Sequence, residues 1–247
     1  MQKLLKNYFN FKNKNVIILG GSKGIGLTIA KKLIDLGATV IIVSRTKPNL
    51  NIVFFKCDFE DLQEVKEVTE KIKKNYKKNW AIVNALAMTI PSNKKIQLPE
   101  IFEKIININL INHYYFISGI VSTVEVGGSI LNISSIYGDL AFPGNPSYSS
   151  SKSGLNGLTR SLSYDLSKKK IRVNSLSAGY IKSNMTKKSY KNKIKRKKIS
   201  NHTLLDRWGN SIEVAMPAIF LISNASSYIN GQNIIVDGGW SVKGFYQ

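Results

Sequence analysis

An apolar run meets a cluster of glycines near the start of the chain, in Val16-Ile17-Ile18-Leu19-Gly20-Gly21-Ser22-Lys23-Gly24-Ile25-Gly26. The apolar run predicts a buried strand, and the periodic residues that follow predict a helix. A tight turn between them needs residues without a Cβ if its backbone is to approach a pyrophosphate at the helix N-terminus. The glycine spacing is GxxxGxG rather than GxGxxG, so the prediction of a dinucleotide site depends on the flanking strand and helix.

Further apolar runs alternate with stretches of helical periodicity along the chain. The predicted strands are Val16–Leu19, Thr39–Val43, Ile52–Phe55, Ala81–Val83, Ser129–Ile133, Arg172–Leu176 and Ile234–Val236. The predicted helices are Gly26–Leu36, Leu62–Tyr76, Ile101–Ser122, Ser149–Leu166 and Ile212–Ile222. Because buried strands separated by helices form right-handed βαβ units, we expect an α/β fold. It is a Rossmann-like, doubly wound parallel sheet of about seven strands with helices on both faces.

The composition indicates one ordinary globular domain. The 247 residues are 43% hydrophobic and 21% charged, and no repeat or linker divides them. We expect residues 1–247 to form a single domain with residues 1–14 as a polar lead-in. No apolar run of about 18 residues is present, and residues 1–14 lack the features of a secretory signal. The lack of such a run means that we expect no membrane partner. Since Cys57 is the only cysteine, we expect a reducing, cytoplasmic location.

The charge balance is unusual, because 36 Lys+Arg against 15 Asp+Glu give a formal net charge of +21. Such a charge suggests binding to nucleic acid or another anion. Lysine supplies 31 of these cations and arginine only 5, whereas bidentate phosphate recognition favours arginine. Enrichment in Lys, Asn and Ile is also what an AT-rich genome produces. No helix-turn-helix, zinc or RNA-binding motif is present, so we expect no nucleic-acid partner.

The end of the second predicted strand, Val43-Ser44-Arg45-Thr46, bears on which dinucleotide binds. An acidic residue there would bind the adenosine ribose hydroxyls and repel a 2′-phosphate, and none is present. Arg45 could instead pair with that phosphate, and Lys23 in the glycine turn could supply a second cation. Both could equally be ordinary solvated cations in a lysine-rich chain. We favour NADP(H) as the cofactor, with NAD(H) as the alternative.

A tyrosine and a lysine stand four residues apart in Tyr148-Ser149-Ser150-Ser151-Lys152. On a helix their side chains share a face, where a nearby ammonium lowers the pKa of a phenol from its usual value of about 10. Ser135 follows the strand predicted at Ser129–Ile133, and the carboxyl ends of strands form the ligand crevice of such sheets. A hydroxyl there could bind a substrate carbonyl. Alone, the first pair could lie on a helix surface and the serine could simply cap a turn.

Together these segments resemble the short-chain dehydrogenase/reductase family, in its main branch of about 250 residues. The resemblance runs from Val16 to about Trp240, which is nearly the whole chain. The matching segments, in the family's order, are Gly20–Gly26, Asp58, Asn84, Asn109-Leu110, Ser135, Tyr148, Lys152, Ile171-Arg172-Val173-Asn174, Gly231-Gln232 and Val236-Asp237-Gly238-Gly239.

The resemblance implies an active enzyme that moves a hydride between a nicotinamide and a carbonyl or secondary alcohol. Tyr148 would be the general acid or base, and Lys152 would hold the nicotinamide ribose and lower the pKa of Tyr148. Ser135 would orient the substrate oxygen. Asn109 would support a water that links Lys152 to solvent, with Asn107 as the fallback because the spacing to Ser135 is about two residues short. No metal is expected.

The same resemblance implies the cofactor contacts. The glycines would approach the pyrophosphate, Asp58 would bind the adenine edge, Asn84 would line the adenosine side, and Ile181–Ser183 would meet the carboxamide. The full set of expected cofactor residues is Gly20, Ser22, Lys23, Gly24, Ile25, Gly26, Arg45, Asp58, Asn84, Tyr148, Lys152, Ile181 and Ser183.

The chain departs from the family's pattern at three places near the cofactor. Leu19 stands where a threonine usually precedes the first glycine, Asn84-Ala85-Leu86-Ala87 replaces Asn-Asn-Ala-Gly, and Ala178 replaces a proline. None of these changes touches Ser135, Tyr148 or Lys152. They motivate one alternative, a non-catalytic binding protein with the family's fold.

A basic run, Lys187–Lys198, lies where the family places a mobile substrate lid, at about residues 183–210. Tyr190 and Ile194 are four apart, so one short helix could turn an apolar face inward. The lysines could be a solvated face, or could recognise a phosphorylated, nucleotide-linked or carrier-bound substrate. Family members of this length act on 3-oxoacyl thioesters or on sugars and keto sugars. The charge also leaves an anion- or nucleic-acid-binding module as a third class.

The resemblance also implies a homo-oligomer, either a dimer or a tetramer. Family members commonly pair two helices across a two-fold axis, and Ile106–Ile120 and Leu155–Leu166 are the segments that would supply them.

Overall fold

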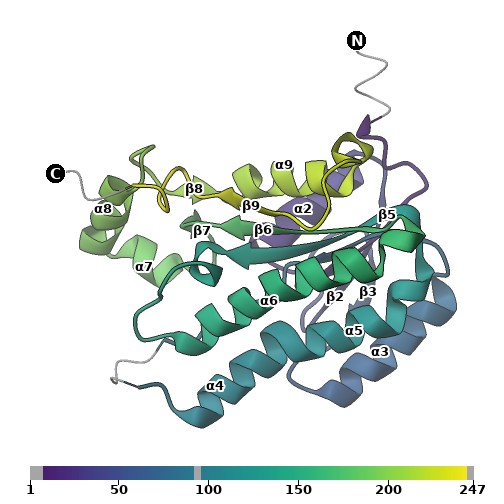
Figure 1. Ribbon diagram of the computed structural model, residues 1–247, viewed down its shortest axis with the longest axis horizontal. Helices are drawn as coiled ribbons and strands as arrows, with labels where there is room; N and C mark the ends of the chain where they lie inside the picture. The colour runs from purple at the N-terminus through teal and green to yellow at the C-terminus, as the bar shows by residue number, and fades with distance from the viewer. Residues whose placement is uncertain (1–7, 92–95, 244–247) are drawn as a thin grey trace.

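The seven predicted strands pair into one parallel sheet in the computed structural model, which describes residues 8–91 and 96–243 (Figure 1). The strands are β1 (Asn15–Leu19), β2 (Thr39–Ser44), β3 (Val53–Lys56), β4 (Asn79–Asn84), β5 (Val124–Ser135), β6 (Arg172–Ala178) and β9 (Asn233–Val236). Their spatial order is β3-β2-β1-β4-β5-β6-β9. This arrangement confirms the predicted Rossmann-like sheet.

Helices cover both faces of the sheet, which explains why its central strands are buried and rich in apolar residues. Helices α2 (Gly24–Asp35) and α9 (Ser211–Ile222) pack on one face (Figure 1). Helices α3 (Leu62–Asn75), α5 (Asn112–Ile120) and α6 (Pro146–Asp165) pack on the other. The helix predicted at Ile101–Ser122 is divided, because α4 (Pro99–Ile106) passes through a π-helical turn at Asn107–Ile111 before α5 begins.

The strand order reverses between β1 and β4, so the loops after these strands leave in different directions. A crevice forms at such a switch point, outside the carboxyl ends of the strands. Leu19 pairs with Asn84 at this edge. Gly20 has a φ of 76°, and a Cβ on it would lie 2.9 Å from the Ala85 carbonyl oxygen. The glycine turn therefore lies directly against the chain that leaves β4.

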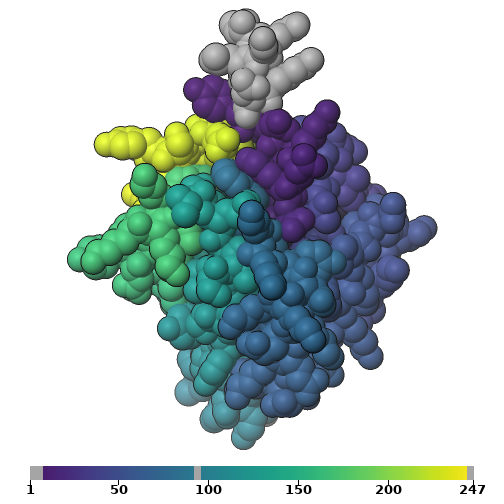
Figure 2. Space-filling view, turned by 90° about the vertical axis from the view of Figure 1, so that its right-hand side faces the viewer, coloured from purple at the N-terminus to yellow at the C-terminus, as the bar shows by residue number. Residues whose placement is uncertain are grey.

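The described part of the expected polar lead-in contributes to the core. Phe11 is buried among residues of α2, α9 and β1, and Phe9 packs against the same cluster. Figure 2 shows the purple N-terminal residues lying beside yellow residues from near the C-terminus. The expectation of a purely polar segment was wrong here, because two phenylalanines in a lysine- and asparagine-rich stretch carry no periodic signal. Residues 1–7 lie outside the described part.

The basic run forms two helices, α7 (Lys187–Lys191) and α8 (Lys193–His202). Asn192 separates them, and its side-chain oxygen accepts a hydrogen bond from the Lys195 amide to cap α8. Tyr190 and Ile194 therefore share no helix face, and Ile194 is 82% exposed. The expected single amphipathic helix was wrong for this reason. The short strands β7 (Ile181–Lys182) and β8 (Gly209–Asn210) pair beside these helices.

Candidate active site

The residues expected to carry the chemistry meet at the carboxyl edge of the sheet. Ser135 is the last residue of β5, and Tyr148 and Lys152 lie in the first two turns of α6. Pro146 begins that helix, where its missing amide hydrogen costs nothing. The Ser135 hydroxyl lies close enough to the Tyr148 phenol to lower its pKa, and the Lys152 Nζ lies 5.8 Å from the centre of the Tyr148 ring. The three side chains that sequence reasoning selected are thus brought together.

Burial dominates the electrostatics of this group. It raises the pKa of Tyr148, while the nearby Ser135 hydroxyl acts in the opposite direction. Burial also lowers the pKa of Lys152 to about 8, although its Nζ donates a hydrogen bond of 2.9 Å to the Ile133 carbonyl. Desolvation of the phenolate is the largest of these influences, so the pKa of Tyr148 lies above its usual value.

Asn109 lies in the π-helical turn and is completely buried. Its side chain accepts a hydrogen bond of 2.7 Å from the Met88 amide and donates one of 2.9 Å to the Met88 carbonyl. It also donates to the Ser151 hydroxyl of α6, at 3.1 Å. Asn107 instead lines a separate hollow, together with Glu60 from the loop before α3 and with residues of α4. The structure therefore places Asn109, and not its fallback, beside the Tyr148 helix.

The glycine turn has the form of a phosphate cradle. Gly26 leaves no room for a side chain, because a Cβ there would lie 2.6 Å from the Gly20 carbonyl oxygen. Lys23 is the N-cap residue of α2 and makes no side-chain cap, so the first amides of the helix are not capped by a side chain. A Cβ on Gly24 would meet the Cβ of Ser183 at 3.7 Å. The turn and the expected carboxamide segment therefore face each other.

Three further residues from the expected cofactor set have these positions. Ser22 and Ile25 lie half-buried within the glycine turn, and Ile181 is buried at the start of β7.

The adenosine side is built from the ends of β2, β3 and β4. Arg45 is exposed after β2, and its Nη1 lies 3.9 Å from a carboxylate oxygen of Asp58. Asn84 is buried and accepts a hydrogen bond of 3.1 Å from the Leu86 amide. Its side-chain nitrogen has no hydrogen-bond partner within residues 8–91 and 96–243. A buried unpaired donor at the switch point fits a dinucleotide that would accept from it.

Backbone bonds or packing contacts are present at all three departures from the family pattern. The Ala85 amide donates a hydrogen bond of 2.9 Å to the Leu19 carbonyl. This bond joins the ends of β1 and β4 at the position where the usual threonine is replaced by Leu19. Ala87 packs against the cluster that contains Tyr148. Gly179, after Ala178, donates 3.0 Å to the Val236 carbonyl. The edge of the sheet remains ordered without the usual residues.

An aromatic cluster beside Tyr148 was missed by sequence reasoning. Tyr137 stacks on Phe142 with ring centres 4.0 Å apart, and its hydroxyl lies 2.5 Å from that of Tyr180. Phe142 also meets the Tyr148 ring edge-on at 6.0 Å, and Trp240 contacts both Tyr137 and Tyr180. These residues span about a hundred positions with no common spacing, so only the fold brings them together.

A buried histidine, His113, was also missed. It is completely buried on α5, with Nε2 2.8 Å from the Asn132 side-chain oxygen. Burial lowers its pKa to about 3, so the ring is neutral. The described part of the chain holds no cluster of His, Cys, Asp and Glu able to bind a metal ion. It also holds no helix long and apolar enough to cross a bilayer.

A phosphate cradle at the switch point of a parallel sheet, beside a tyrosine and a lysine on one helix, defines a dinucleotide-dependent oxidoreductase. Residues 20–241 match a family model described as Enoyl-(Acyl carrier protein) reductase. The chain belongs to the short-chain dehydrogenase/reductase family and is an NAD(P)-dependent oxidoreductase.

Named relatives cover almost the whole chain. A 3-oxoacyl-[acyl-carrier-protein] reductase of Rickettsia typhi is 34% identical over 93% of this chain and 98% of its own. A 2-dehydro-3-deoxy-D-gluconate 5-dehydrogenase of Dickeya dadantii is 31% identical over 96% of this chain and 99% of its own. The crystal structure of a protein from Agrobacterium tumefaciens with bound NADP, described as a 2-deoxy-D-gluconate 3-dehydrogenase, superposes with a TM-score of 0.87. It is 25% identical and covers 96% of this chain and 99% of its own.

Proposed function

We propose that this chain interconverts a carbonyl and a secondary alcohol with NADP(H), using Tyr148 as the acid or base. The observation that carries the proposal is the buried Tyr148 phenol, which lies beside the Ser135 hydroxyl and one helical turn from the buried Lys152. When bound, the nicotinamide would supply or accept the hydride. Ser135 would hold the substrate oxygen, and Tyr148 would give it a proton during reduction or remove one during oxidation.

Residues of the glycine turn would hold the cofactor. Gly20, Gly24 and Gly26 would let the backbone approach its pyrophosphate, and Ser183 would meet its nicotinamide end. Lys152 would bind the nicotinamide ribose, and Asn109, fixed on Met88, would support the water that links Lys152 to solvent. These roles are supported by the cradle, the burial and the hydrogen bonds described above.

NADP(H) is proposed over NAD(H) because the β2 end carries Arg45 and no acidic residue. A guanidinium pairs well with a phosphate, and Lys23 stands at the start of α2 as a second cation. Bound NADP in the structure from Agrobacterium tumefaciens supports the same choice. Asp58 and Asn84 would contact the adenosine from the ends of β3 and β4.

The substrate is proposed to be a 3-oxoacyl thioester, which is the type named for the Rickettsia typhi relative. A sugar-derived ketone is the second candidate, because the Dickeya dadantii relative is named for one. Residues 183–210, which contain α7 and α8, would form the lid over this substrate. The lone cysteine, Cys57, supports a reducing, cytoplasmic location.

A substrate screen with Tyr148→Phe tests the proposal. Acyl thioesters and keto sugars are offered with NADPH or NADH, and turnover is followed as loss of nicotinamide absorbance. The phenylalanine variant should lose about 10²- to 10⁴-fold in kcat, because it cannot transfer the proton. Its affinity for NADPH, measured by fluorescence titration, should be nearly unchanged. Undiminished turnover, or no binding of either nucleotide by the unaltered protein, would refute the proposal.

A further inference from the structure

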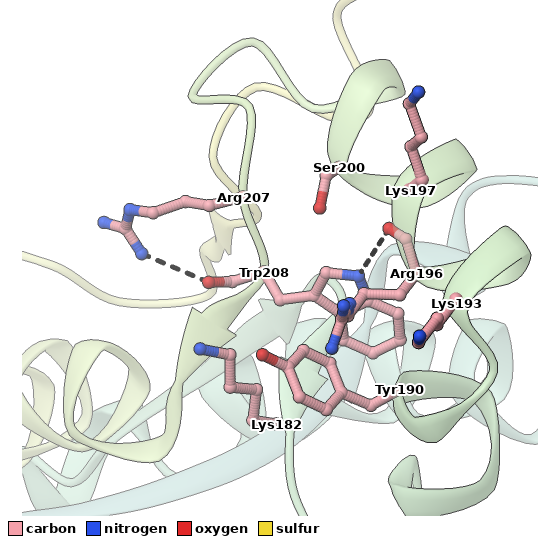
Figure 3. Close-up of a pocket in the computed structure, with 8 residues that line it drawn as sticks. All are labelled: Lys182, Tyr190, Lys193, Arg196, Lys197, Ser200, Arg207 and Trp208. Carbon is pink, nitrogen blue, oxygen red and sulfur yellow. Dashed lines mark hydrogen bonds between the residues drawn. The ribbon is translucent and has the colours of Figure 1, made fainter.

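Helices α7 and α8 enclose a hollow with β7 and the loop before β8, at the surface of the segment proposed as the lid (Figure 3). We call it the lid pocket and define it by its five cationic residues, Lys182, Lys193, Arg196, Lys197 and Arg207. Its volume is about 430 Å³, within the range of small-molecule sites. It shares no lining residue with the glycine turn or with Ser135, Tyr148 and Lys152.

The cations reach the lid pocket from different parts of the chain. Lys182 comes from β7 and Arg207 from the loop before β8, whereas the other three lie on α8. The Tyr190 ring holds two of them at the wall, because the Lys182 Nζ lies 5.1 Å and the Arg196 Cζ 5.4 Å from its centre. The convergence is therefore a product of tertiary structure and not of one run of lysines.

Little negative charge offsets these cations. Glu213 forms two hydrogen bonds with Arg207, at 2.6 and 2.8 Å, and these bonds lower the pKa of Glu213 to about 2. In the part of the chain that the structure describes, the other four cations form no ion pair. Like charges gathered in a hollow repel one another and concentrate a positive potential there. A multiply charged anion would offset that repulsion.

The walls favour a compact oxyanion. Arg196 offers a planar fork that suits phosphate, and the lysines add mobile point charges. The Ser200 hydroxyl also lines the pocket, and Trp208 closes its floor with an indole that donates to the Arg196 carbonyl (Figure 3). A hollow of this size is too small for a duplex or a folded acidic protein, which would need an extended surface.

We propose that the lid pocket binds a small ligand that carries two or more phosphate charges, at a site separate from the cofactor cradle. Trp208 also contacts Tyr180 of the aromatic cluster, with ring centres 5.2 Å apart. The pocket-lining Trp208 therefore joins the lid pocket directly to the aromatic cluster beside Tyr148.

Pyrophosphate is the probe, titrated into the full chain by calorimetry. The test variant is Arg196→Gln/Lys197→Gln, which removes two pocket cations. The matched control is Lys195→Gln/Lys198→Gln, which removes two cations from the same helix that do not line the pocket. Both variants carry the same net charge, and circular dichroism melting checks that both are folded. Any pyrophosphate held at the glycine turn contributes equally to both.

The pocket variant should lose about tenfold or more in pyrophosphate affinity, and the control less than about twofold. Equal losses in the two variants would overturn the proposal, as would the absence of pyrophosphate binding to the unaltered protein. A short DNA duplex is titrated in parallel. If it binds more tightly than pyrophosphate and weakens equally in both variants, the cations form a general basic surface and the proposal fails.

The source of the phosphate is determined separately, with any carbonyl substrate that turns over. A KM that rises in the pocket variant for a phosphorylated substrate, at unchanged kcat, assigns the phosphate to the substrate. An unchanged KM, together with lost pyrophosphate binding, assigns it to a separate ligand.

Discussion

The charge of Lys152 is a cost to folding, because burial lowers its pKa from 10.5 to about 8. Between these two values the unfolded chain binds a proton that the folded chain has released, so folding stability rises with pH across this window. Lys152→Met removes the effect. As the pH rises from 8 to 10.5, we expect the free energy of unfolding of the unaltered protein to increase by on the order of 1–3 kcal/mol relative to that of this variant.

Urea unfolding of both proteins at several pH values provides the measurement. The Ile133 carbonyl loses its Lys152 partner in the variant at every pH, so this loss shifts the difference between the two proteins without changing its slope. A stability difference that stays constant from pH 7 to pH 10.5 would contradict the assigned burial of the ammonium.

Arg45 gives a residue-scale prediction about cofactor choice. If its guanidinium meets the 2′-phosphate, Arg45→Ala should weaken NADPH binding by about tenfold or more and leave NADH binding within about twofold. Lys47→Ala is the control, because Lys47 is also exposed and removes the same charge two residues away. Fluorescence titration measures both nucleotides. If both variants weaken NADPH binding equally, Arg45 contributes only a general electrostatic attraction and not a specific contact with the phosphate.

Individual residues were predictable where a local motif defines them. Tyr148 and Lys152 share a helix turn, and Ser135 ends a strand, so their meeting follows from the fold class. The pKa of Tyr148 was not predictable, since it depends on how completely the phenol is buried. Neither was the partner of Asn109, because the π-helical turn that positions it has no distinct sequence pattern.

At the scale of the element, Gly26 decides how closely α2 approaches β1 and β4. Gly26→Ala should destabilise the fold by about 1–3 kcal/mol, because its new Cβ would lie 2.6 Å from a backbone oxygen that cannot move freely. Gly157→Ala on α6 is the matched control. Its Cβ would meet only the end of the Arg160 side chain, at 3.9 Å.

The control should be more stable than the unaltered protein by about 0.5–1 kcal/mol, because alanine favours a helix over glycine. The same chemical change thus has opposite expected signs in the two helices. Urea unfolding measures both, and a gain at both positions would show that α2 has room that the geometry excludes.

Whole elements were predictable in proportion to their periodicity. All seven strands of the main sheet were located from short runs rich in apolar residues, which are typical of strands in a sheet covered on both faces. The pair β7 and β8 has two residues in each strand, too few for any pattern. The helices α7 and α8 were merged in the prediction, because the break depends on Asn192 turning its side chain back to cap the second helix.

At the scale of the whole molecule, only part of the net charge of +21 is gathered at one place in the fold. The composition alone could not separate genome bias from recognition. Most lysines lie exposed on the surface, whereas the lid pocket collects five cations from two elements and one loop segment. Only the fold brings Lys182 and Arg207 to α8, so no inspection of the basic run could have included them.

Assembly is the property of the whole molecule that can be tested most directly. The helices proposed to pair across a two-fold axis leave large apolar side chains exposed, including Ile111, Tyr114 and Tyr115 near or on α5 and Tyr164 on α6. Tyr164 is 82% exposed, so its ring is available to a partner helix. We expect sedimentation to give a dimer or tetramer and not the single-chain mass of 27.6 kDa.

Tyr164→Arg should shift this assembly toward single chains, because a buried unpaired charge opposes association. Val126→Arg is the control, since Val126 is similarly exposed at 73% but lies at the start of β5, outside both proposed helices. If the two-fold contact uses the α5 and α6 faces, only the first variant dissociates. Dissociation by both variants, or a single-chain mass for the unaltered protein, would show that these faces do not form the assembly.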